Sequence, residues 1–336
     1  MTHRRIGIDI GHTGVRVAEV EAPPGRRPKL VAFGQSGIEP GAVQGCAVQR
    51  HEAVVAAVRR ALRASGARSR HAVVGVAGEH TYVRPVALPA ASPEQMRASL
   101  PFLVQDALPV DVAECVLDFW PVRQLDRVIE GLLVAVRSAE ASDVVRAAEK
   151  AGARVDHVDL AAFGLLRATV PATRDEPVTA VVDLGCDGMQ VVVGEGGTPQ
   201  LVRFGPAAGL AVAQEVAGAL GRDPSVAEHV LDAELVARPE VAAMVASHAE
   251  QIAQVIAQTL AYHAQSGRRP AEAVVLTGRG AELPGLGQCL ATVTRLPVAF
   301  ARPEAVFEVA AKAGRGCAGA PRSWSVAAGL ALRGAA

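Results

Sequence analysis

Two stretches of the chain carry the same pattern of apolar and polar positions. Residues 5–21 form two Val- and Ile-rich runs around a glycine-containing turn, and residues 178–194 repeat the arrangement. Such runs joined by a short turn are typical of β-hairpins. Aligned on Asp9 and Asp183, both stretches read Asp, aliphatic, Gly, two variable residues, Gly, Val or Met, polar, Val. The repeat predicts an internally duplicated α/β protein, in which each half opens with a hairpin and continues through helices.

Helical periodicity predicts most of the remaining elements. The apolar stripe of one helix ends at Gly66, a residue type that favours a left-handed C-cap. A second helix is expected to be capped by Ser138. The expected helices span residues 50–67, 138–152, 155–170, 210–220, 239–265 and 323–334, with a short helix beginning at Pro224.

The segment between the two halves has a different texture. Residues 81–89 contain two prolines, which favours an edge strand. Ser92 to Gln95 resembles a capping box before a helix that Pro101 should kink or split in two. Two more strands follow, so this segment is interpreted as a small inserted α+β unit. The predicted organisation is a first subdomain (1–80, 151–175 and 321–336), the inserted subdomain (81–150), a second subdomain (176–210 and 268–320) and a helical part of the second lobe (211–267).

Composition narrows the functional classes. The chain has 336 residues, 50% of them hydrophobic and 3% aromatic, and its 34 basic residues balance 34 acidic ones. A neutral chain has no overall attraction to nucleic acid or anionic lipid. Five dispersed cysteines suit reduced thiols in a cytosol. No secretory leader and no run of about 18 apolar residues is present, so a soluble cytoplasmic protein is expected.

The doubled acidic turn predicts chemistry. Glycines permit positive φ and leave room for backbone N–H groups to hold anionic oxygens. An Asp at the end of the first strand is placed to hold Mg²⁺ through water, and the ion would bridge phosphates. A single Asp-x-Gly turn would be unremarkable, but two with the same flanks favour a shared phosphate cleft. The candidates are Asp9, Gly11, His12, Thr13, Gly14, Arg16, Asp183, Gly185, Cys186, Asp187 and Gly188, with Asp9 and Asp183 as the metal candidates.

A third glycine-rich turn follows a buried strand and precedes a helix, at residues 276–286. Backbone at such a turn can approach a ribose or a flat ring. The turn is weak evidence alone, but after two phosphate turns it is the expected adenosine clamp. Its candidate residues are Gly278, Arg279, Gly280, Leu283 and Pro284.

The order of these parts resembles the actin-like ATPase superfamily and, within it, the PilM family of type IV pilus assembly. The similar segments are "GIDIGHTGVRVAEV", "LPVDVAECVLDFWPV", "LLVAVRSAEASDVVRAAEKAGARVDHVDLAAF", "VVDLGCDGMQVVV", "VVLTGRGAELPGL" and "SVAAGLALRG", in family order from Ile6 to Gly334. The resemblance implies an α/β, ribonuclease H-like, duplicated two-lobe fold that binds ATP and Mg²⁺ between its lobes.

The same resemblance implies a partner and a location. The family docks the cytoplasmic N-terminal tail of the membrane protein PilN and forms a layer at the cytoplasmic face of the inner membrane, within reach of the pilus motor ATPases. Membrane association is therefore expected only through partners, and no nucleic-acid partner is expected. The tail-binding groove lies by the inserted subdomain, and the candidates there are Val116, Leu117, Asp118 and Phe119.

Some positions depart from the family pattern. Arg16 stands where Lys is usual, Gly188 and Met189 stand where a Ser or Thr is expected, and Arg279 replaces a Gly. Nucleotide binding is still predicted in spite of these departures. Because of them, hydrolysis is left open and no catalytic residue is assigned. The alternatives are a small-molecule kinase of the same superfamily, for which Asp118 is the one candidate carboxylate, and a division-type actin homologue, which would end in an amphipathic membrane helix.

Overall fold

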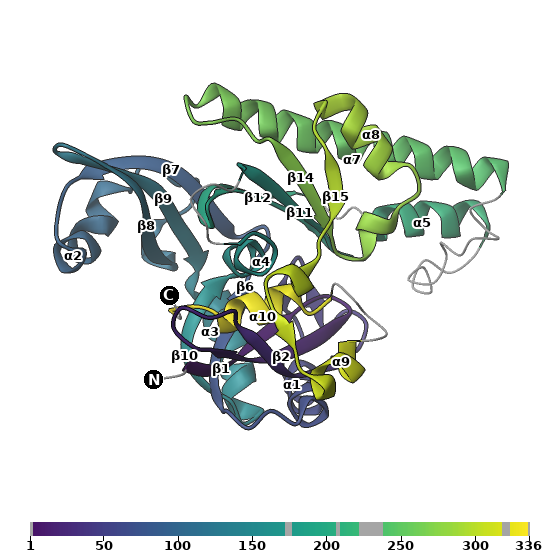
Figure 1. Cartoon of the computed structure of the whole chain (residues 1–336), viewed down its shortest axis with the longest axis horizontal. Coiled ribbons are helices and arrows are strands. Elements are labelled where there is room, and N and C mark those ends of the chain that lie inside the picture. Colours follow the sequence, from purple (N-terminus) through teal and green to yellow (C-terminus); the bar gives the residue numbers. More distant parts are fainter. Residues whose placement is uncertain (1–2, 172–176, 206–208, 222–237, 318–322, 335–336) are drawn as a thin grey trace.

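Two sheets that share an order of five strands form the framework of the protein, and the first sheet has a sixth strand, β16. The structure is a computed structural model that describes residues 3–171, 177–205, 209–221, 238–317 and 323–334 (Figure 1). The first sheet runs β10-β6-β1-β2-β3-β16 and the second β13-β12-β11-β14-β15. In each sheet the first two strands of that half form an antiparallel hairpin. The third strand pairs with one side of this hairpin, and parallel strands pair with the other side. The predicted duplication is confirmed.

The first lobe surrounds the six-stranded sheet. Its elements are β1 (His3–Ile10), β2 (Gly14–Ala22), β3 (Lys29–Gly37), the short hairpin β4 (Val43–Gln44) and β5 (Ala47–Val48), α1 (His51–Ser65), β6 (His71–Val76), α3 (Ser138–Lys150), β10 (Arg154–Leu160), α4 (Ala161–Thr169), η4 (Pro303–Ala305), β16 (Glu308–Val309), α9 (Ala311–Cys317) and α10 (Ser325–Ala331).

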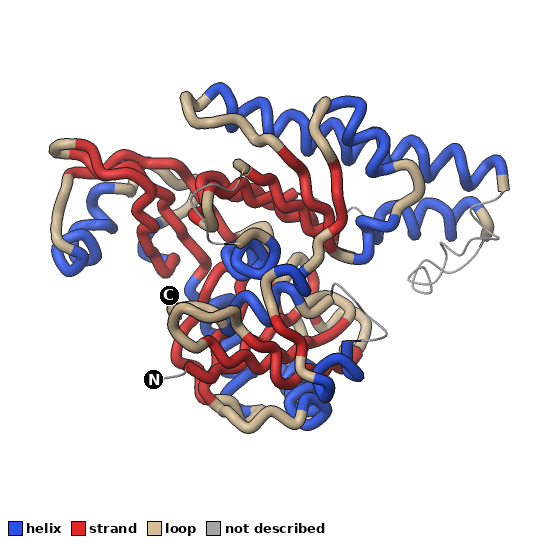
Figure 2. The backbone as a smooth tube through the Cα atoms, viewed as in Figure 1, coloured by secondary structure: helices blue, strands red, loops and turns tan. Residues whose placement is uncertain are grey.

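A three-stranded antiparallel sheet stands beside the first lobe, between β6 and α3 in the chain (Figure 2). Its order is β7-β9-β8, so β7 is an edge strand as its prolines predict. Its elements are β7 (Thr81–Pro89), α2 (Pro93–Leu103), η1 (Val112–Glu114), β8 (Cys115–Leu125) and β9 (Val128–Arg137).

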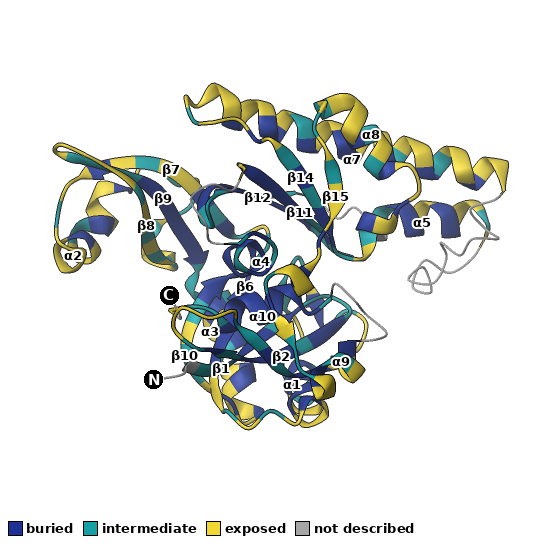
Figure 3. Cartoon of the chain, viewed as in Figure 1, coloured by how far each residue is buried: buried dark blue, intermediate teal, exposed yellow. Residues whose placement is uncertain are grey.

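The second lobe packs helices against the five-stranded sheet. An apolar cluster joins its strands to α5, α7 and α8, and Figure 3 shows the central strands buried beneath helices whose outer faces are exposed. Its elements are β11 (Thr179–Leu184), β12 (Met189–Glu195), β13 (Thr198–Gly205), α5 (Gly209–Ala219), α7 (Pro239–Gln265), β14 (Ala273–Thr277), η3 (Arg279–Glu282), α8 (Leu286–Thr294) and β15 (Val298–Phe300). The short helix expected from Pro224 lies outside the described residues.

Helix caps test the local predictions. Gly66 has φ 56° and closes α1 in the left-handed conformation, and Ser92 with Gln95 forms a complete capping box at the start of α2. Pro101 is accommodated in the last turn of α2, which ends at Leu103. The predicted Ser138 cap is wrong: the N-cap of α3 is Arg137, and no side chain caps that helix.

The prediction of one helix over residues 155–170 is also wrong. Its first half is the edge strand β10, which pairs in parallel with β6, and only Ala161 onward forms α4. Helical and strand periods are hard to separate in so short an apolar run. Buried Asp159, at the end of β10, is held by Arg167 and Arg333, an arrangement that depends on tertiary contacts.

Glu19 ties three segments of the first lobe together. Its buried carboxylate accepts hydrogen bonds from Arg4 Nε at 2.9 Å, from Ser69 N at 2.6 Å and from Arg68 N at 3.1 Å. Burial alone would raise the pKa of Glu19, but these hydrogen bonds outweigh it and hold the pKa below the ordinary value of 4.5.

We expect Glu19→Ala to lower the free energy of unfolding by about 2 kcal/mol at neutral pH, because the N–H groups of Arg68 and Ser69 lose their acceptor, while Arg4 keeps its ion pair with Glu21. The unfolded state binds the proton more readily, so the stabilisation by Glu19 is present above pH 4.5 and declines as the pH falls below it. Denaturant unfolding of both proteins at neutral pH and near pH 4 measures this. A difference that is the same at both pH values would contradict the assignment.

Candidate functional site

A cavity of about 1130 Å³ lies between the two lobes. Both hairpin turns line it, together with the start of the third glycine-rich turn, the end of β6, the start of β7 and the start of α10. Its volume is of the order of known small-molecule sites, which span about 300–1,000 Å³. Segments far apart in sequence thus meet around one space.

The two turns have the same backbone closure. The N–H of Gly11 donates to the carbonyl of Gly14 at 3.0 Å, and the N–H of Gly185 donates to the carbonyl of Gly188 at 2.9 Å. None of these four glycines adopts a positive φ, which corrects the sequence-based reason for their presence. Gly14 and Gly185 are needed for space, since a Cβ would lie 2.8 Å from the carbonyl oxygen of Ser36 and 2.9 Å from that of Gly188, respectively, whereas Gly188 has room for a Cβ.

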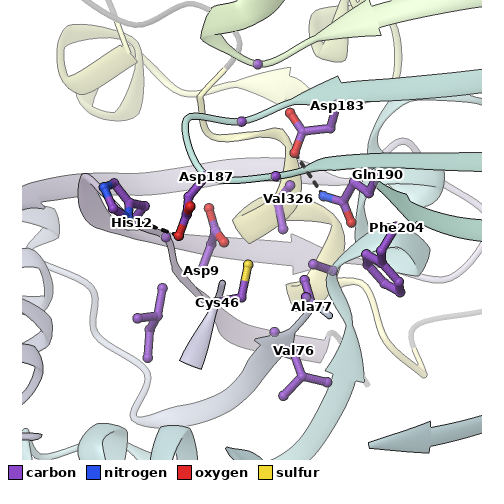
Figure 4. A pocket seen from close by; sticks show the side chains of 18 of the residues that line it. Asp9, His12, Cys46, Val76, Ala77, Asp183, Asp187, Gln190, Phe204 and Val326 are labelled. Atoms are coloured by element: carbon purple, nitrogen blue, oxygen red, sulfur yellow. Dashed lines mark hydrogen bonds and ion pairs between the residues drawn. The ribbon is translucent and has the colours of Figure 1, made fainter. Parts of the chain in front are cut away.

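Each acidic residue is held by the side chain directly opposite it in its hairpin. Asp9 pairs with Arg16 in the β1–β2 register, and Asp183 pairs with Gln190 in the β11–β12 register. Arg16 Nη1 lies 3.3 Å from Asp9 Oδ2, and Gln190 Nε2 donates to Asp183 Oδ2 at 2.8 Å (Figure 4). Arg16, predicted as a phosphate-reaching cation, is engaged with Asp9. Asp9 is therefore paired with a cation, whereas Asp183 accepts a hydrogen bond from a neutral amide.

The space between these carboxylates favours a positive charge. Burial raises the pKa of Asp9 and of Asp183 above the ordinary 3.8, although Arg16 and Gln190 oppose the rise. Burial, together with the charges of Asp187, Asp9 and Asp183, also raises the pKa of the Cys46 thiol to about 12. The Cys46 thiol therefore stays protonated, and a cation in this place would relieve the repulsion between the acidic groups.

One acceptor in the site has no assigned donor. Gln190 is 8% exposed, and its Oε1 is buried without a hydrogen-bond partner among the residues that the structure describes. A buried unsatisfied oxygen is costly and calls for an explanation. In Figure 4 this oxygen points away from Asp183, toward the side of the cavity that holds Cys46 and Ala77.

The third glycine-rich turn packs directly onto the second acidic turn. Gly278 has φ 81°, and a Cβ there would lie 2.5 Å from Asp183 Oδ1 and 2.4 Å from the carbonyl oxygen of Leu184. A Cβ on Gly280 would lie 3.0 Å from the Leu184 Cβ. These glycines are thus required for contact with the end of β11, whether or not a ring approaches the turn.

Asp187 connects the lobes at the tips of the turns. Its Oδ2 lies 3.1 Å from His12 Nδ1, on the first hairpin, and accepts a hydrogen bond of 2.5 Å from the N–H of Gly45 (Figure 4). Gly45 and Cys46 form the turn of the small β4–β5 hairpin of the first lobe. This cross-lobe contact joins His12 and Asp187, both predicted as site residues, to the turn at Gly45, which was not predicted.

The structure places most of the predicted site residues on the cavity wall, but not all of them. Gly280, Leu283 and Pro284 are not among the lining residues, and Leu283 is part of the apolar core of the second lobe. The predicted residues that line the cavity are Asp9, Gly11, His12, Thr13, Gly14, Arg16, Asp183, Gly185, Cys186, Asp187, Gly188, Gly278 and Arg279.

Other lining residues were missed. Gln190 could have been found, because it occupies the same place relative to Asp183 as Arg16 does to Asp9, seven residues on in each repeat. Gly45 and Cys46 gave no signal, since their hairpin has only two residues in each strand. Arg203 and Glu140 also line the cavity, and no local pattern distinguishes them.

The four residues predicted to bind a partner lie on β8, outside the cavity, and divide between two faces. Leu117 and Phe119 pack against the cluster beneath α2, whereas Val116, 55% exposed, and Asp118 point to the opposite face. β8 is the outer strand of its sheet and pairs on one side only, with β9, among the described strands. The outer backbone groups of β8 are therefore not paired with any strand that the structure describes.

The exposed face of β8 continues toward the first lobe. Trp120, on the same face as Val116, is 37% exposed, and its ring centroid lies 5.3 Å from that of Phe163 on α4. A partly exposed aromatic residue next to exposed backbone is typical of an interaction surface.

Comparison with known proteins identifies the family. The sequence matches the family "Type IV pilus assembly protein PilM" over residues 7–335. The chain belongs to this family. No curated protein matches the chain.

Solved structures of PilM and of other actin-like proteins share the fold. A "PilM-PilN type IV pilus biogenesis complex" matches with a TM-score of 0.85 and 22% identity, covering 99% of this chain and 98% of that one. The ethanolamine utilization protein EutJ from Carboxydothermus hydrogenoformans matches with a TM-score of 0.59 and 14% identity over 98% and 90% of the chains. A diol dehydratase-reactivating factor in nucleotide-free form matches with a TM-score of 0.56 and 11% identity, covering 99% of this chain and 100% of that one. The chain is thus an actin-like protein of the PilM family, as its sequence predicts.

Two further findings concern membrane-spanning helices and metal-binding groups in this PilM-family protein. No helix among the described residues has the length and apolarity needed to cross a membrane. Over the same residues, no group of three or more His, Cys, Asp or Glu is arranged to hold a metal ion. A cation held by Asp9 and Asp183 would therefore need water or phosphate oxygens to complete its coordination.

Proposed function

We propose that this PilM-family protein is a nucleotide-binding scaffold of the type IV pilus assembly platform, at the cytoplasmic face of the inner membrane. It binds Mg-ATP between its lobes and docks the cytoplasmic N-terminal tail of PilN beside the three-stranded sheet. The observation that carries the nucleotide part is the cavity in which two equivalent acidic turns meet.

The residues present fit a hydrated magnesium ion and phosphates. Two carboxylates with raised pKa values offer oxygen acceptors, as does Gln190 Oε1, which is buried without a partner in the described part of the chain. The glycine turns leave space in which backbone N–H groups can meet anionic oxygens. Asp9 and Asp183 would hold the ion, which would supply charge neutralisation for the phosphates. Arg279 lines the same cavity and is exposed, so its guanidinium is available to stack on a base.

The kinase alternative receives no support from the geometry. Asp118, its candidate carboxylate, lies on β8 and is not among the residues that line the cavity. A phosphoryl acceptor in the cavity would have no contact with it. A scaffold role needs no such carboxylate.

Tail docking is proposed on β8 because an extended peptide can add to its outer side. Backbone hydrogen bonds would supply affinity, and alternate side chains would contact the face that carries Val116 and Trp120. The match to a PilM–PilN complex supports the choice of PilN as the partner.

Val116→Asp tests the docking surface. We expect it to weaken binding of a synthetic PilN tail peptide at least about tenfold, since it places a charge on an apolar contact. Val293→Asp on α8 is the matched control: Val293 is 40% exposed on the second lobe, so this variant should bind as the unmodified protein does. Calorimetric titration of all three proteins measures this. Equal affinities for the unmodified protein and Val116→Asp would exclude this surface.

A further inference from the structure

Asp187 reaches from the second lobe into a pair of donors on the first. Its Oδ2 accepts from the Gly45 N–H at 2.5 Å and faces His12 Nδ1 at 3.1 Å. A carboxylate only accepts hydrogen bonds, so the imidazole presents an N–H at this position. Two donors from separate segments therefore converge on one anionic oxygen.

The turn that carries one donor is held in an unusual shape. Gly45 and Cys46 have φ values of 55° and 67°, the positive values at both central positions that define a type I′ hairpin turn. The left-handed conformation is unfavourable for Cys46, and such residues persist where the surroundings fix them. Gly78 packs behind the turn, since a Cβ on it would lie 2.3 Å from the Gly45 carbonyl oxygen. The Gly45 N–H is thus a fixed donor at the cavity wall.

We infer that the Gly45 N–H and His12 form the binding point for the terminal phosphate of a nucleotide, and that Asp187 occupies this point as an internal phosphate mimic when no nucleotide is present. The inference rests on the nucleotide binding proposed above and extends it, because it names the phosphate contacted and the group that competes for the same donors.

Charge makes the two occupants mutually exclusive. Asp187 lies with Asp9 and Asp183 close enough for all three to act on the Cys46 thiol, so this end of the cavity is already negative. A terminal phosphate that accepted from the same N–H groups would meet the Asp187 carboxylate and displace it. The phosphate would then replace Asp187 as the group that links the two lobes. Only molecules in which Asp187 has left the donors could bind nucleotide, so the apparent affinity would be lower than the intrinsic affinity by the fraction of such molecules.

Asp187→Ala tests the inference on the full-length protein with two readouts. We expect ATP to bind about tenfold more tightly than to the unmodified protein, the factor that one charge-assisted hydrogen bond supplies, and ADP affinity to change less. Without nucleotide, hydrogen exchange of the Gly45 amide should become about tenfold faster, because its acceptor is gone. Adding His12→Ala should then reduce the preference for ATP over ADP. Asp187→Asn, which retains an acceptor oxygen but loses the charge, should also bind ATP more tightly.

An exposed pair of the same type is the control. His71 Nδ1 lies 3.0 Å from Asp156 Oδ2 on the first lobe, outside the cavity, so Asp156→Ala should change neither readout. If ATP and ADP bind the unmodified protein and Asp187→Ala changes neither affinity, the inference is wrong while nucleotide binding stands. Unchanged Gly45 exchange in Asp187→Ala also contradicts it. If no variant binds nucleotide, both the inference and the proposed nucleotide site fail.

Discussion

Asp183→Asn is expected to weaken binding of Mg-ATP at least about 100-fold, a loss of ~2.7 kcal/mol. The substitution removes the carboxylate that no cation neutralises, since Arg16 serves Asp9 and only the Gln190 amide serves Asp183. Removal of Mg²⁺ with a chelator should reduce the affinity of the unmodified protein in the same way and should have little further effect on the variant. Calorimetric titration with ATP, with and without Mg²⁺, measures both.

Gln190→Leu examines the support behind Asp183. We expect Gln190→Leu to weaken binding of Mg-ATP about 10–100-fold. Loss of the amide frees the Asp183 carboxylate to reorient, and groups that position a metal ligand typically contribute a factor of this size. The matched control is Gln200→Leu, since Gln200 is also 8% exposed and its amide donates to Glu195 elsewhere in the same sheet. If Gln190→Leu and Gln200→Leu bind Mg-ATP equally well, Gln190 has no special role in the site.

Gly329→Ala is expected to prevent stable folding, with a loss that exceeds about 4 kcal/mol. Gly329 lies where α10 crosses α4, and a Cβ on it would lie 1.7 Å from the carbonyl oxygen of Gly164. Neither backbone can move away, because α10 also packs on β1, where a Cβ on Gly7 would lie 1.8 Å from the Ala327 carbonyl oxygen. This crossing joins the end of the chain to the helix between the two sheets.

Gly287→Ala is the control for the loss of a helical glycine. Gly287 lies in α8 with open space around it, so a methyl group should fit and improve helix propensity by about 0.5–1 kcal/mol. Denaturant unfolding of the two variants measures the difference. A Gly329→Ala protein that unfolds at the same denaturant concentration as the unmodified chain would contradict the packing described for α10.

Repetition made the site predictable. A single acidic turn would not distinguish itself from an ordinary loop, but Asp9 and Asp183 in equal contexts predict two hairpins, and these lie on one cavity. The duplication also predicts that each half opens with a hairpin, because each half must bury the same pattern of apolar positions. The capping box at Ser92 and the C-cap at Gly66 were predictable for a different reason, since their hydrogen bonds are local.

The remaining features depend on contacts between distant residues. Residues 155–160 form a strand because β6 offers them a parallel partner, and nothing in their own sequence states that. Asp187 could be assigned to the site, but its partner Gly45 lies 142 residues away in a hairpin too short to show a periodic pattern. Gly278 was predicted as a turn residue, whereas its tight packing on Asp183 follows only from the adjacency of β11 and β14.

Helix α4 of the first lobe connects the two proposed sites. Trp120 on the tail-binding strand packs on Phe163 of α4, and Leu166 of the same helix packs against β12 next to Gly194. A change in the relative position of the lobes would therefore move α4 against the face of β8. This continuity is the physical basis for expecting nucleotide and tail to affect each other.

Titration of the unmodified protein with the PilN tail peptide, with and without saturating Mg-ATP, tests this account most directly. We predict that the two affinities differ by at least about fivefold, and that the tail changes the affinity for Mg-ATP by the same factor. Equal tail affinities in the two conditions, in a protein that demonstrably binds both ligands, would contradict a nucleotide-dependent scaffold.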